Sequence, residues 1–575
     1  MKKLLALFLT FALALAFVPA AFAEGEVEAE DIVVLYTNDV HCSVAQAEKD
    51  GTATNMGYAG VAAYKAEMKA ITANVALVDC GDAIQGDAIG TLSTGRYLID
   101  IMNKTGYDYA VYGNHEFDYG MDRLKELTKD ADFEYLSCNF TNLLIGRTLL
   151  DSYAIQKFGD KKVAFVGIST PESITKSTPA YFQDKDGNYI YGFCSGGKGQ
   201  ELYDAVQVSV NAAKAAGADY VVAIAHLGVD GQSKPWCSTD VIANTTGIDV
   251  VLDGHSHSTI AQKIVKNKAG KNVVLSSTGD KLQNLGRLVI KPDGKITTNL
   301  IAAKDYTKQD AAVDKYVKRI ESQYEALLNK TVAKTGVDLV VNDPETGKRI
   351  IRKQESNLGD LCADAYRELL DADIAFVNGG GIRATISKGS ITYGEIISVH
   401  PFGNMACSIE VTGQQILDAL ELGSMFTPDA ESGGFLQVSG LTYEIHTYIP
   451  SSVTLDANKS FVGVTGARRV KNVMVGGEPI DVSKTYTLAS HNYMLKDGGD
   501  GYTMFKGAKV VRDGVMIDNQ VLINYIKDAL NGTVGSEYEN PYGQGRIKLV
   551  AEAPANQPGN PASSSSHSGS GISVG

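Results

Sequence analysis

The sequence predicts an α/β protein built from two large domains. Short runs rich in Val and Ile recur through the first half of the chain, for example IVVLYTND, VALVDCGD and YVVAIAHL. They are bounded by Gly or Asn, which is typical of buried strands. The length of 575 residues also exceeds that of one ordinary domain. The chain can therefore bury two separate cores.

Polar side chains that bind hard metals follow these predicted strands. Open α/β sheets bind ligands at the carboxyl ends of their strands, so these side chains are expected to meet at one sheet edge. Five of the nine histidines of the chain lie at these strand ends, His115 included, which argues against chance placement. The candidate metal ligands are Asp39, His41, Asp82, Asn114, His226, His255 and His257.

The spacing of these residues indicates a site for two metal ions. In a strand, residues i and i+2 point to the same side, so Asp39 with His41, and His255 with His257, can each reach one cavity. Asp82 can bridge two cations, and a pair of metals suits phosphoryl chemistry because the attacking and leaving oxygens both need charge neutralised. The mixed Asp, His and Asn set fits zinc, manganese, iron or cobalt better than calcium.

Both ends of the chain differ in composition from the rest. Residues 1–23 have two early lysines, an apolar run and an Ala-Phe-Ala site, which predicts a signal peptide. No later run is long enough to be a membrane helix, so we expect a protein without a transmembrane segment after cleavage. It would be secreted, either extracellular or in the periplasm or at the cell surface. Residues 551–575 are rich in Ser, Gly and Pro and predict a disordered tail.

Charge and cysteine content limit the partners. The net charge of −14 argues against a nucleic-acid polymer as partner, although small anions can still bind locally. We expect a monomer. Among the seven cysteines, Cys194 and Cys237 lie in polar segments and are the disulfide candidates if the protein reaches an oxidising compartment.

The pattern of apolar residues changes near residue 309. Residues 24–308 contain the metal-binding motifs and end in a hairpin around Pro292-Asp293-Gly294. Residues 309–330 have apolar side chains at helical spacing without Gly or Pro, which predicts a stiff linker helix. Residues 331–550 have their own helix and strand patterns, which predicts a second domain with its own core.

The second half has Gly-rich turns that each contain a recognition residue. NGGGIRA contains Arg383, HPFGN contains Phe402 and KDGGDGY contains Asp500. Arginine binds phosphate with two hydrogen bonds, an aromatic ring stacks on a base, and a carboxylate accepts hydrogen bonds from ribose hydroxyls. These three turns therefore predict a nucleotide pocket.

The ordered motifs NDVH, GDAIQGD, GNHEFD, AHLG and GHSH resemble those of bacterial members of the secreted 5′-nucleotidase, UDP-sugar hydrolase and 2′,3′-cyclic phosphodiesterase family. The resemblance extends over nearly all of residues 31–550. It implies an N-terminal metallophosphoesterase β-sandwich flanked by helices, followed by a separate α/β C-terminal domain that binds the substrate.

The same resemblance implies a role for each motif residue. His115 and Asp118 would form a catalytic pair that stabilises charge on the transferring phosphoryl group. One metal would be held by Asp39, His41, Asp82 and His257, and the other by Asp82, Asn114, His226 and His255.

In the second domain, family substrate-binding positions match Arg352, Asn378, Arg383, Phe402 and Asp500. One position departs from the family, which places a second aromatic residue six positions before the Asp of GGD. Here that position is Met494, and Tyr493 precedes it. Either side chain could form the second wall of the base pocket.

These features favour an exported, metal-dependent hydrolase that converts 5′-nucleotides to nucleosides and phosphate. Nucleoside di- and triphosphates and UDP-sugars are further candidate substrates. A 2′,3′-cyclic nucleotide phosphodiesterase with 3′-nucleotidase activity is an alternative, because the metal motifs are shared. A catalytically silent nucleotide-binding surface protein is a third, but such a protein has no need for both His115 and Asp118.

Overall fold

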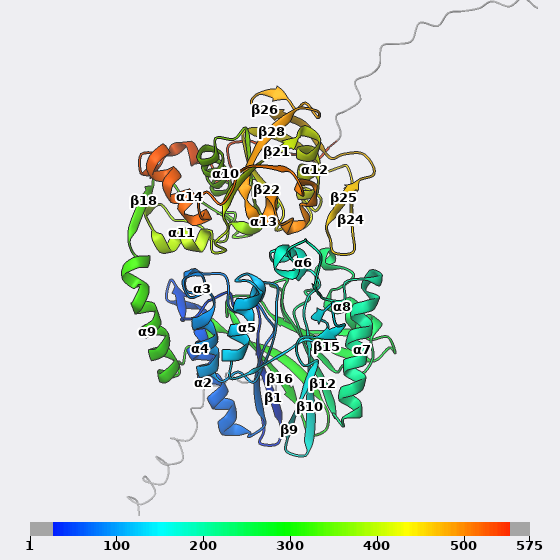
Figure 1. The fold of residues 1–575 in the computed structure, drawn as a ribbon. Helices are drawn as coiled ribbons and strands as arrows, with labels where there is room; N and C mark the ends of the chain where they lie inside the picture. Colours follow the sequence, from blue (N-terminus) through cyan, green and yellow to red (C-terminus); the bar gives the residue numbers. More distant parts are fainter. Residues whose placement is uncertain (1–26, 553–575) are drawn as a thin grey trace, which may run out of the picture.

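The computed structural model describes residues 27–552, and its first part is a sandwich of two six-stranded sheets (Figure 1). The predicted signal peptide, and the predicted tail from residue 553 on, lie outside the described residues. The first sheet has the order β17 (Ile296–Ala302), β16 (Asn284–Ile290), β1 (Ile32–Thr37), β4 (Val75–Asp79), β5 (Tyr109–Val111) and β6 (Glu134–Leu136). The second has the order β14 (Thr259–Lys266), β15 (Asn272–Thr278), β13 (Val250–Asp253), β12 (Tyr220–Ala225), β10 (Lys161–Ile168) and β9 (Tyr153–Phe158).

The central strands are apolar along their whole length because both of their faces are buried. In β1, Val34 and Tyr36 pack into the core between the two sheets, where they join Val222 and Ile224 of β12. Alternate residues such as Leu35 face the helices outside the first sheet. The five runs predicted as strands are therefore formed, but they belong to two sheets and not to one.

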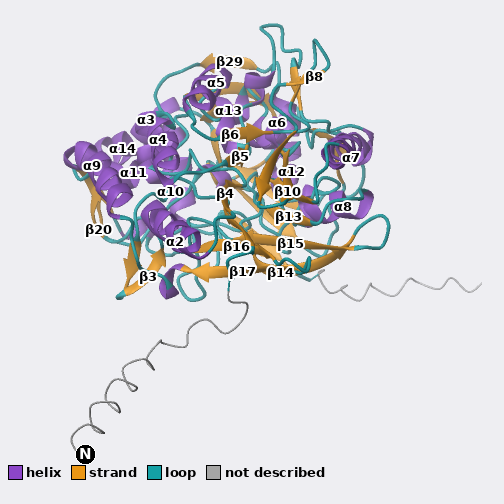
Figure 2. Ribbon diagram, turned by 90° about the horizontal axis from the view of Figure 1, so that it is seen from below, coloured by secondary structure: helices purple, strands orange, loops and turns teal. Residues whose placement is uncertain are grey.

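Helices cover the outer face of each sheet. Against the first sheet lie α2 (Gly57–Ile71), α4 (Arg96–Thr105) and α5 (Met121–Asp130). Against the second lie α7 (Gln200–Ala215) and α8 (Ser238–Asn244). Figure 2 shows the two helical layers on opposite flanks of the strands.

The predicted linker helix is α9 (Ala311–Leu328), and it packs against the first domain. The Asp310 carboxylate caps it by accepting hydrogen bonds from the backbone N–H of Ala312 and Val313. Val313, Val317 and Ile320, predicted at helical spacing, are buried in the core beneath α2 and α4.

The second domain is built on a five-stranded sheet. Its order is β22 (Leu436–Ser439), β19 (Ile374–Asn378), β28 (Thr485–His491), β21 (Ala406–Thr412) and β29 (Lys509–Arg512). One face packs against α10 (Asn357–Leu370) and α14 (Asp518–Asn524), and the other against α12 (Gly413–Gly423). The protein is therefore a two-domain α/β structure, as predicted.

A hairpin of the second domain reaches toward the first. It consists of β24 (Val453–Leu455) and β25 (Phe461–Val464), and Figure 1 shows it directed at the lower domain beside α6 (Ser173–Lys176). At its tip, Asn458 accepts a 2.6 Å hydrogen bond from the Ser195 hydroxyl. The two domains are thus in contact at a point far from α9.

The predicted disulfide does not form. All seven cysteines are unpaired, and Cys194 and Cys237 contact different parts of the first domain. The Cys237 thiol is buried and donates a hydrogen bond to Asp240 over 3.0 Å, whereas the Cys194 thiol donates to the Asn139 carbonyl over 3.6 Å. The polar sequence around these cysteines was therefore no guide to their distance in space. Within residues 27–552, no helix is both long enough and apolar enough to span a bilayer.

We predict that the core between the sheets dominates the stability of the first domain. Val222→Ala removes two methyl groups from a fully buried side chain and should lower the free energy of unfolding by about 2 kcal/mol. Val208→Ala is the matched control, because this side chain is 68% exposed, and it should change stability by less than about 0.5 kcal/mol. Urea denaturation followed by circular dichroism measures both, and equal effects would contradict the prediction.

Candidate active site

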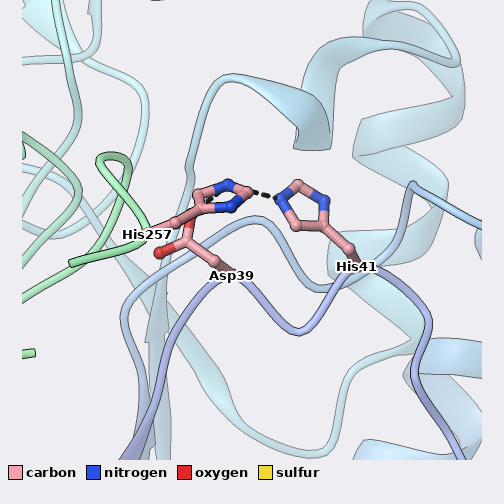
Figure 3. A group of neighbouring side chains, drawn as sticks. All are labelled: Asp39, His41 and His257. Carbon is pink, nitrogen blue, oxygen red and sulfur yellow. Dashed lines mark hydrogen bonds and ion pairs between the residues drawn. The ribbon is translucent and has the colours of Figure 1, made fainter. Parts of the chain in front are cut away.

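The predicted metal ligands come together beyond the strand ends in two adjacent groups. Asp39, His41 and His257 form the first, and Figure 3 shows the two imidazole rings facing each other beside the carboxylate. The second group is Asp82, His226 and His255. In each group, one ligand atom from each residue lies within 4.8 Å of the others.

The ligands are placed by loops with left-handed backbone and not by strand alternation. β1 ends at Thr37, and Asp39 and His41 beyond it have φ angles of 49° and 47°. β13 ends at Asp253, and His255 and His257 have φ angles of 78° and 52°. His255 and His257 both line one cavity, as expected, but a turn and not strand alternation places them there, and each joins a different group.

In the first group, a hydrogen bond leaves the Nε2 lone pair of His41 directed at His257. The His41 Nδ1–H donates to the Gln85 carbonyl over 2.9 Å, so the lone pair is on Nε2. This Nε2 lies 3.1 Å from His257 Nε2, which in turn lies 3.5 Å from Asp39 Oδ1. Donors bound to one ion at about 2.1 Å are separated by about 3–3.4 Å, so this spacing fits a shared cation.

In the second group, hydrogen bonds likewise leave one ring nitrogen of each histidine free for a metal. The His226 Nδ1–H donates to the Cys80 carbonyl over 2.7 Å, and Nε2 lies 3.1 Å from Asp82 Oδ2 without forming a hydrogen bond. The buried Asn114 Oδ1 also has no hydrogen-bond partner. His255 Nε2 is bonded to Glu172 over 2.7 Å, which leaves Nδ1 for a metal. Asp82 Oδ2 also lies 4.0 Å from His41 Nε2, so its carboxylate faces both groups.

Burial makes negative charge costly here, and the pKa values respond to this. Burial raises the pKa of Asp39 well above its usual value. Burial alone would lower the pKa of His226, but the carboxylates of Asp82 and Asp39 raise it to about 10. The two carboxylates therefore require positive charge close by. Divalent cations would supply it, and the unpartnered Asn114 oxygen and inward histidine lone pairs fit them.

Two glutamates support the ligands, and the sequence motifs assigned no role to either. Glu116, within GNHE, accepts backbone hydrogen bonds from Asp82, Ala83 and Gly113 over 2.7–2.8 Å and so fixes the loop that carries Asp82. Glu172 orients His255. Glu172 follows β10, a central strand of the second sheet whose end had no recognised motif, so its position was the available signal.

His115 and Asp118 form the predicted pair. His115 Nδ1 lies 2.6 Å from Asp118 Oδ2, and Asp118 Oδ1 accepts a 2.9 Å hydrogen bond from the Ser177 hydroxyl. The His115 backbone N–H also donates to Asp82 Oδ1 over 2.8 Å. Asp118 thus fixes the His115 ring beside the second group of ligands.

A cavity of about 360 Å³ connects the metal ligands with the second domain. It contains both His115 and Asp118, together with ligands from both groups. The predicted substrate-binding residues that line it are Arg352, Asn378, Arg383, Phe402, Tyr493 and Asp500. The two predicted halves of the site therefore face each other.

Met494 is the one predicted pocket residue that the structure places elsewhere. The chain forms a helical turn, α13 (Asn492–Leu495), and Met494 is fully buried in the core beneath α12. Tyr493, one position earlier, lines the cavity. Consecutive helical residues point in different directions, so the turn brings Tyr493 to the pocket and directs Met494 away from it.

Three arginines give the second-domain side of the cavity a strong positive charge. Arg349, to which the motifs assigned no role, lies 3.4 Å from Glu431. Burial, together with the nearby Arg349, lowers the pKa of Arg352 and brings that of Arg383 to about 10. The Arg383 guanidinium also lies 5.7 Å from the centre of the Phe402 ring. Such a cluster is suited to an anionic ligand.

Comparison with known proteins agrees with this geometry. The model of the calcineurin-like phosphoesterase family matches residues 32–259, and that of the 5′-nucleotidase C-terminal domain matches residues 333–507. The chain thus combines a calcineurin-like phosphoesterase domain with a 5′-nucleotidase C-terminal domain. Members of this family are hydrolases, and the calcineurin-like domain uses divalent metals.

Individual relatives of this metallophosphoesterase span both of its domains. It is 28% identical to a snake venom 5′-nucleotidase of Gloydius brevicauda over 86% of each chain. It is 27% identical to a trifunctional nucleotide phosphoesterase of Bacillus subtilis over 90% of its own length, but it spans only 35% of that relative. The crystal structure of a 5′-nucleotidase precursor from Thermus thermophilus matches 91% of the chain and all of that structure, with a TM-score of 0.75 and 27% identity.

We predict that Asp82 contributes to both metal positions. Asp82→Ala should lose both ions on dialysis because its carboxylate faces both groups of ligands, whereas His257→Ala should lose one. Elemental analysis measures the metal content, and circular dichroism confirms folding. Asp160→Ala is the control, since this exposed carboxylate lies in the β9–β10 turn. Two ions retained by Asp82→Ala would contradict the assignment.

Proposed function

We propose that the protein is exported and hydrolyses 5′-nucleotides to nucleosides and phosphate, with two divalent transition-metal ions in its active site. One observation supports this most directly. Two groups of metal ligands, with Asp82 directed at both, share one cavity with the arginines and Phe402 of the second domain. A phosphate ester can therefore contact the metal ligands while its nucleoside contacts the second domain.

The metal ligands would be those predicted from the motifs. Asp39, His41, Asp82 and His257 would hold one ion, and Asp82, Asn114, His226 and His255 the other. Bound metal ions lower the pKa of a coordinated water and neutralise charge on phosphoryl oxygens. The nitrogen and oxygen donors fit zinc, manganese, iron or cobalt.

His115 is proposed to stabilise the transferring phosphoryl group. Asp118 accepts the Nδ1–H, and Ser177 fixes the carboxylate, so the opposite ring nitrogen is free to donate to a phosphoryl oxygen. Donors that are oriented before the reaction need no rearrangement in the transition state, and this makes them effective catalysts.

The second domain is proposed to hold the rest of the nucleotide. Arg352 and Arg383 would bind phosphate oxygens, and Asp500 with Asn378 would bind the ribose. Phe402 and Tyr493 would flank the base. The Tyr493 hydroxyl donates to the Thr175 carbonyl over 2.8 Å and accepts from the Asp500 backbone N–H, which holds its ring in place.

The third arginine favours a wider substrate range. Arg349 adds positive charge beside Arg352 and Arg383, which suits nucleoside di- and triphosphates and UDP-sugars. Hydrolysis of 2′,3′-cyclic nucleotides would use the same metal ligands. A purely nucleotide-binding protein would not need the oriented pair of His115 and Asp118.

The substrate range is tested by removing metals with a chelator, restoring manganese, zinc or cobalt, and measuring phosphate released from AMP. UDP-glucose and 2′,3′-cyclic AMP are assayed in parallel. We expect no turnover of AMP in the chelated protein and turnover in the reloaded protein. Faster hydrolysis of 2′,3′-cyclic AMP would favour the phosphodiesterase, and binding of AMP without turnover would favour the silent protein.

We predict that His115 acts in the chemical step and not in metal binding. His115→Ala should lower kcat by about 10²–10⁴-fold, the usual scale for a positioned proton donor or charge stabiliser. Metal content should remain at the parental level. His446→Ala is the control, because this histidine lies in β23 (Leu441–His446) and bonds to Glu444 outside the cavity. Loss of metal from His115→Ala would show that His115 has a different role.

We also predict that aromatic stacking contributes to base recognition. Phe402→Ala and Tyr493→Ala should each weaken AMP binding by about 1–3 kcal/mol. The same substitutions should barely change the binding of ribose 5-phosphate, because this ligand has no base. Met494→Ala should leave the KM for AMP nearly unchanged because Met494 does not line the cavity. Parental KM values for AMP in both aromatic variants would contradict a base pocket at this position.

A further inference from the structure

A short segment of the first domain, residues 172–177, contacts both halves of the active site. It consists of the single helical turn α6 with one residue on each side. At its start Glu172 bonds to His255, and at its end the Ser177 hydroxyl donates to Asp118. The segment therefore supports a metal ligand and the catalytic pair at the same time.

The last turn of this segment also contacts the second domain. The Lys176 ammonium donates to Asp500 Oδ1 over 3.0 Å, and the Tyr493 hydroxyl donates to the carbonyl of Thr175, the preceding residue. Asp500 is 324 positions away in the sequence, so this ion pair forms only when the domains face each other. The Lys176 side chain is 30% exposed and that of Asp500 is 4% exposed, so the pair is partly shielded from water.

Asp500 is held from both sides. Its second oxygen, Oδ2, accepts a 2.7 Å hydrogen bond from the Asn378 amide, and the Asn378 carbonyl oxygen accepts one from His491 Nε2 over 3.2 Å. A carboxylate oxygen has two lone pairs, so each oxygen can accept one further hydrogen bond. Lys176 and Asn378 together therefore fix the carboxylate while leaving acceptor capacity directed at the cavity.

We propose that Lys176 is a positioning residue for nucleoside recognition, which holds the Asp500 carboxylate in the orientation that accepts the ribose hydroxyls. The inference rests on the proposed nucleotidase function. It assigns to the first domain a part in recognising the sugar, although the motifs place sugar recognition entirely in the second. Lys176 itself lines the cavity, and Asp500 is its one ion-pair partner among residues 27–552, so the proposed route of its action is through that carboxylate.

Two nearby carboxylates keep the ammonium group of Lys176 positively charged. Burial would lower the pKa of its ammonium group, but Asp500 and Glu172 raise it above the usual value. Glu172 also bonds to His255 and to the Ser233 hydroxyl, so it is a fixed negative charge behind the lysine. Asp500 and Glu172 therefore both favour the charged form of Lys176.

The test compares a ligand that contains ribose with one that does not. In Lys176→Met, the KM for AMP should rise about 10-fold, the usual effect of losing a hydrogen bond between charged groups. The inhibition constant of inorganic phosphate, measured against AMP, should stay within about twofold because phosphate has no ribose, and kcat should change less than the KM. Lys176→Arg keeps the positive charge and should restore most of the affinity for AMP.

A double-mutant cycle separates action through Asp500 from direct contact with the substrate. If Lys176 works through the carboxylate, Lys176→Met should have no further effect on the KM for AMP once Asp500→Ala is present. If the effects of Lys176→Met and Asp500→Ala on the KM for AMP instead multiply in the double variant, the positioning role is overturned. A KM for AMP in Lys176→Met equal to that of the parent, or an equal rise in the phosphate inhibition constant, would also overturn it.

Lys459→Met is the matched control. Lys459 lies at the tip of the β24–β25 hairpin, and its ammonium donates to the Lys234 carbonyl and lies 5.2 Å from the Trp236 ring, so it also joins the two domains. Lys459 does not line the cavity, so any loss of affinity in Lys459→Met should be equal for AMP and for inorganic phosphate. A parent protein that releases no phosphate from any nucleotide overturns the proposed function itself, whereas an active parent with an unchanged Lys176→Met overturns this inference alone.

Discussion

The burial of two carboxylates, Asp39 and Asp82, in one small volume is the constraint on which the active site depends. Neither side chain is more than 2% exposed, so their charges cannot be stabilised by bulk water. The surrounding groups respond to this requirement. Histidine lone pairs point inward, His226 has a raised pKa, and backbone N–H groups of His255 and His115 donate to the two carboxylates. Divalent cations complete such a site, and their charge becomes available for chemistry on a phosphate ester.

Much of the fold could be predicted because its central strands are buried on both faces. This produces continuous runs such as IVVLYTND, which have few alternative structures. The linker helix was equally clear, since Val313, Val317 and Ile320 mark one face. The division of the strands between two sheets was not visible in these runs, because a strand sequence does not record which neighbour it pairs with. Only the resemblance to a known family indicated a sandwich.

The metal ligands were recognised by residue type, but the reason first given for their convergence was wrong. Strand alternation does not apply at Asp39 or His257, because both adopt left-handed backbone conformations in turns. Similarly, spacing alone left Tyr493 and Met494 as equal candidates, and only the helical turn of α13 distinguishes them. No role was assigned to Glu116, although it lies in GNHE, or to Glu172, because these side chains support the candidate ligands and are not ligands themselves. The Lys176–Asp500 contact joins residues in different domains, which no local pattern reveals.

The packing of α9 against the first domain determines where the two domains can move relative to each other. Because α9 is anchored to the first domain through Val317 and Ile320, while its last turn contacts α11 (Tyr393–Val399) of the second, the domains are connected at the few residues before β18 (Thr331–Thr335). In Figure 1 this connection lies at one side of the molecule and the β24–β25 hairpin at the other. A rotation about residues 329–330 would therefore move the hairpin tip, which lies on the opposite side of the molecule, over a long arc. The contacts of Asn458 and Lys459 with the first domain act at a long lever arm, where a small force opposes a large torque.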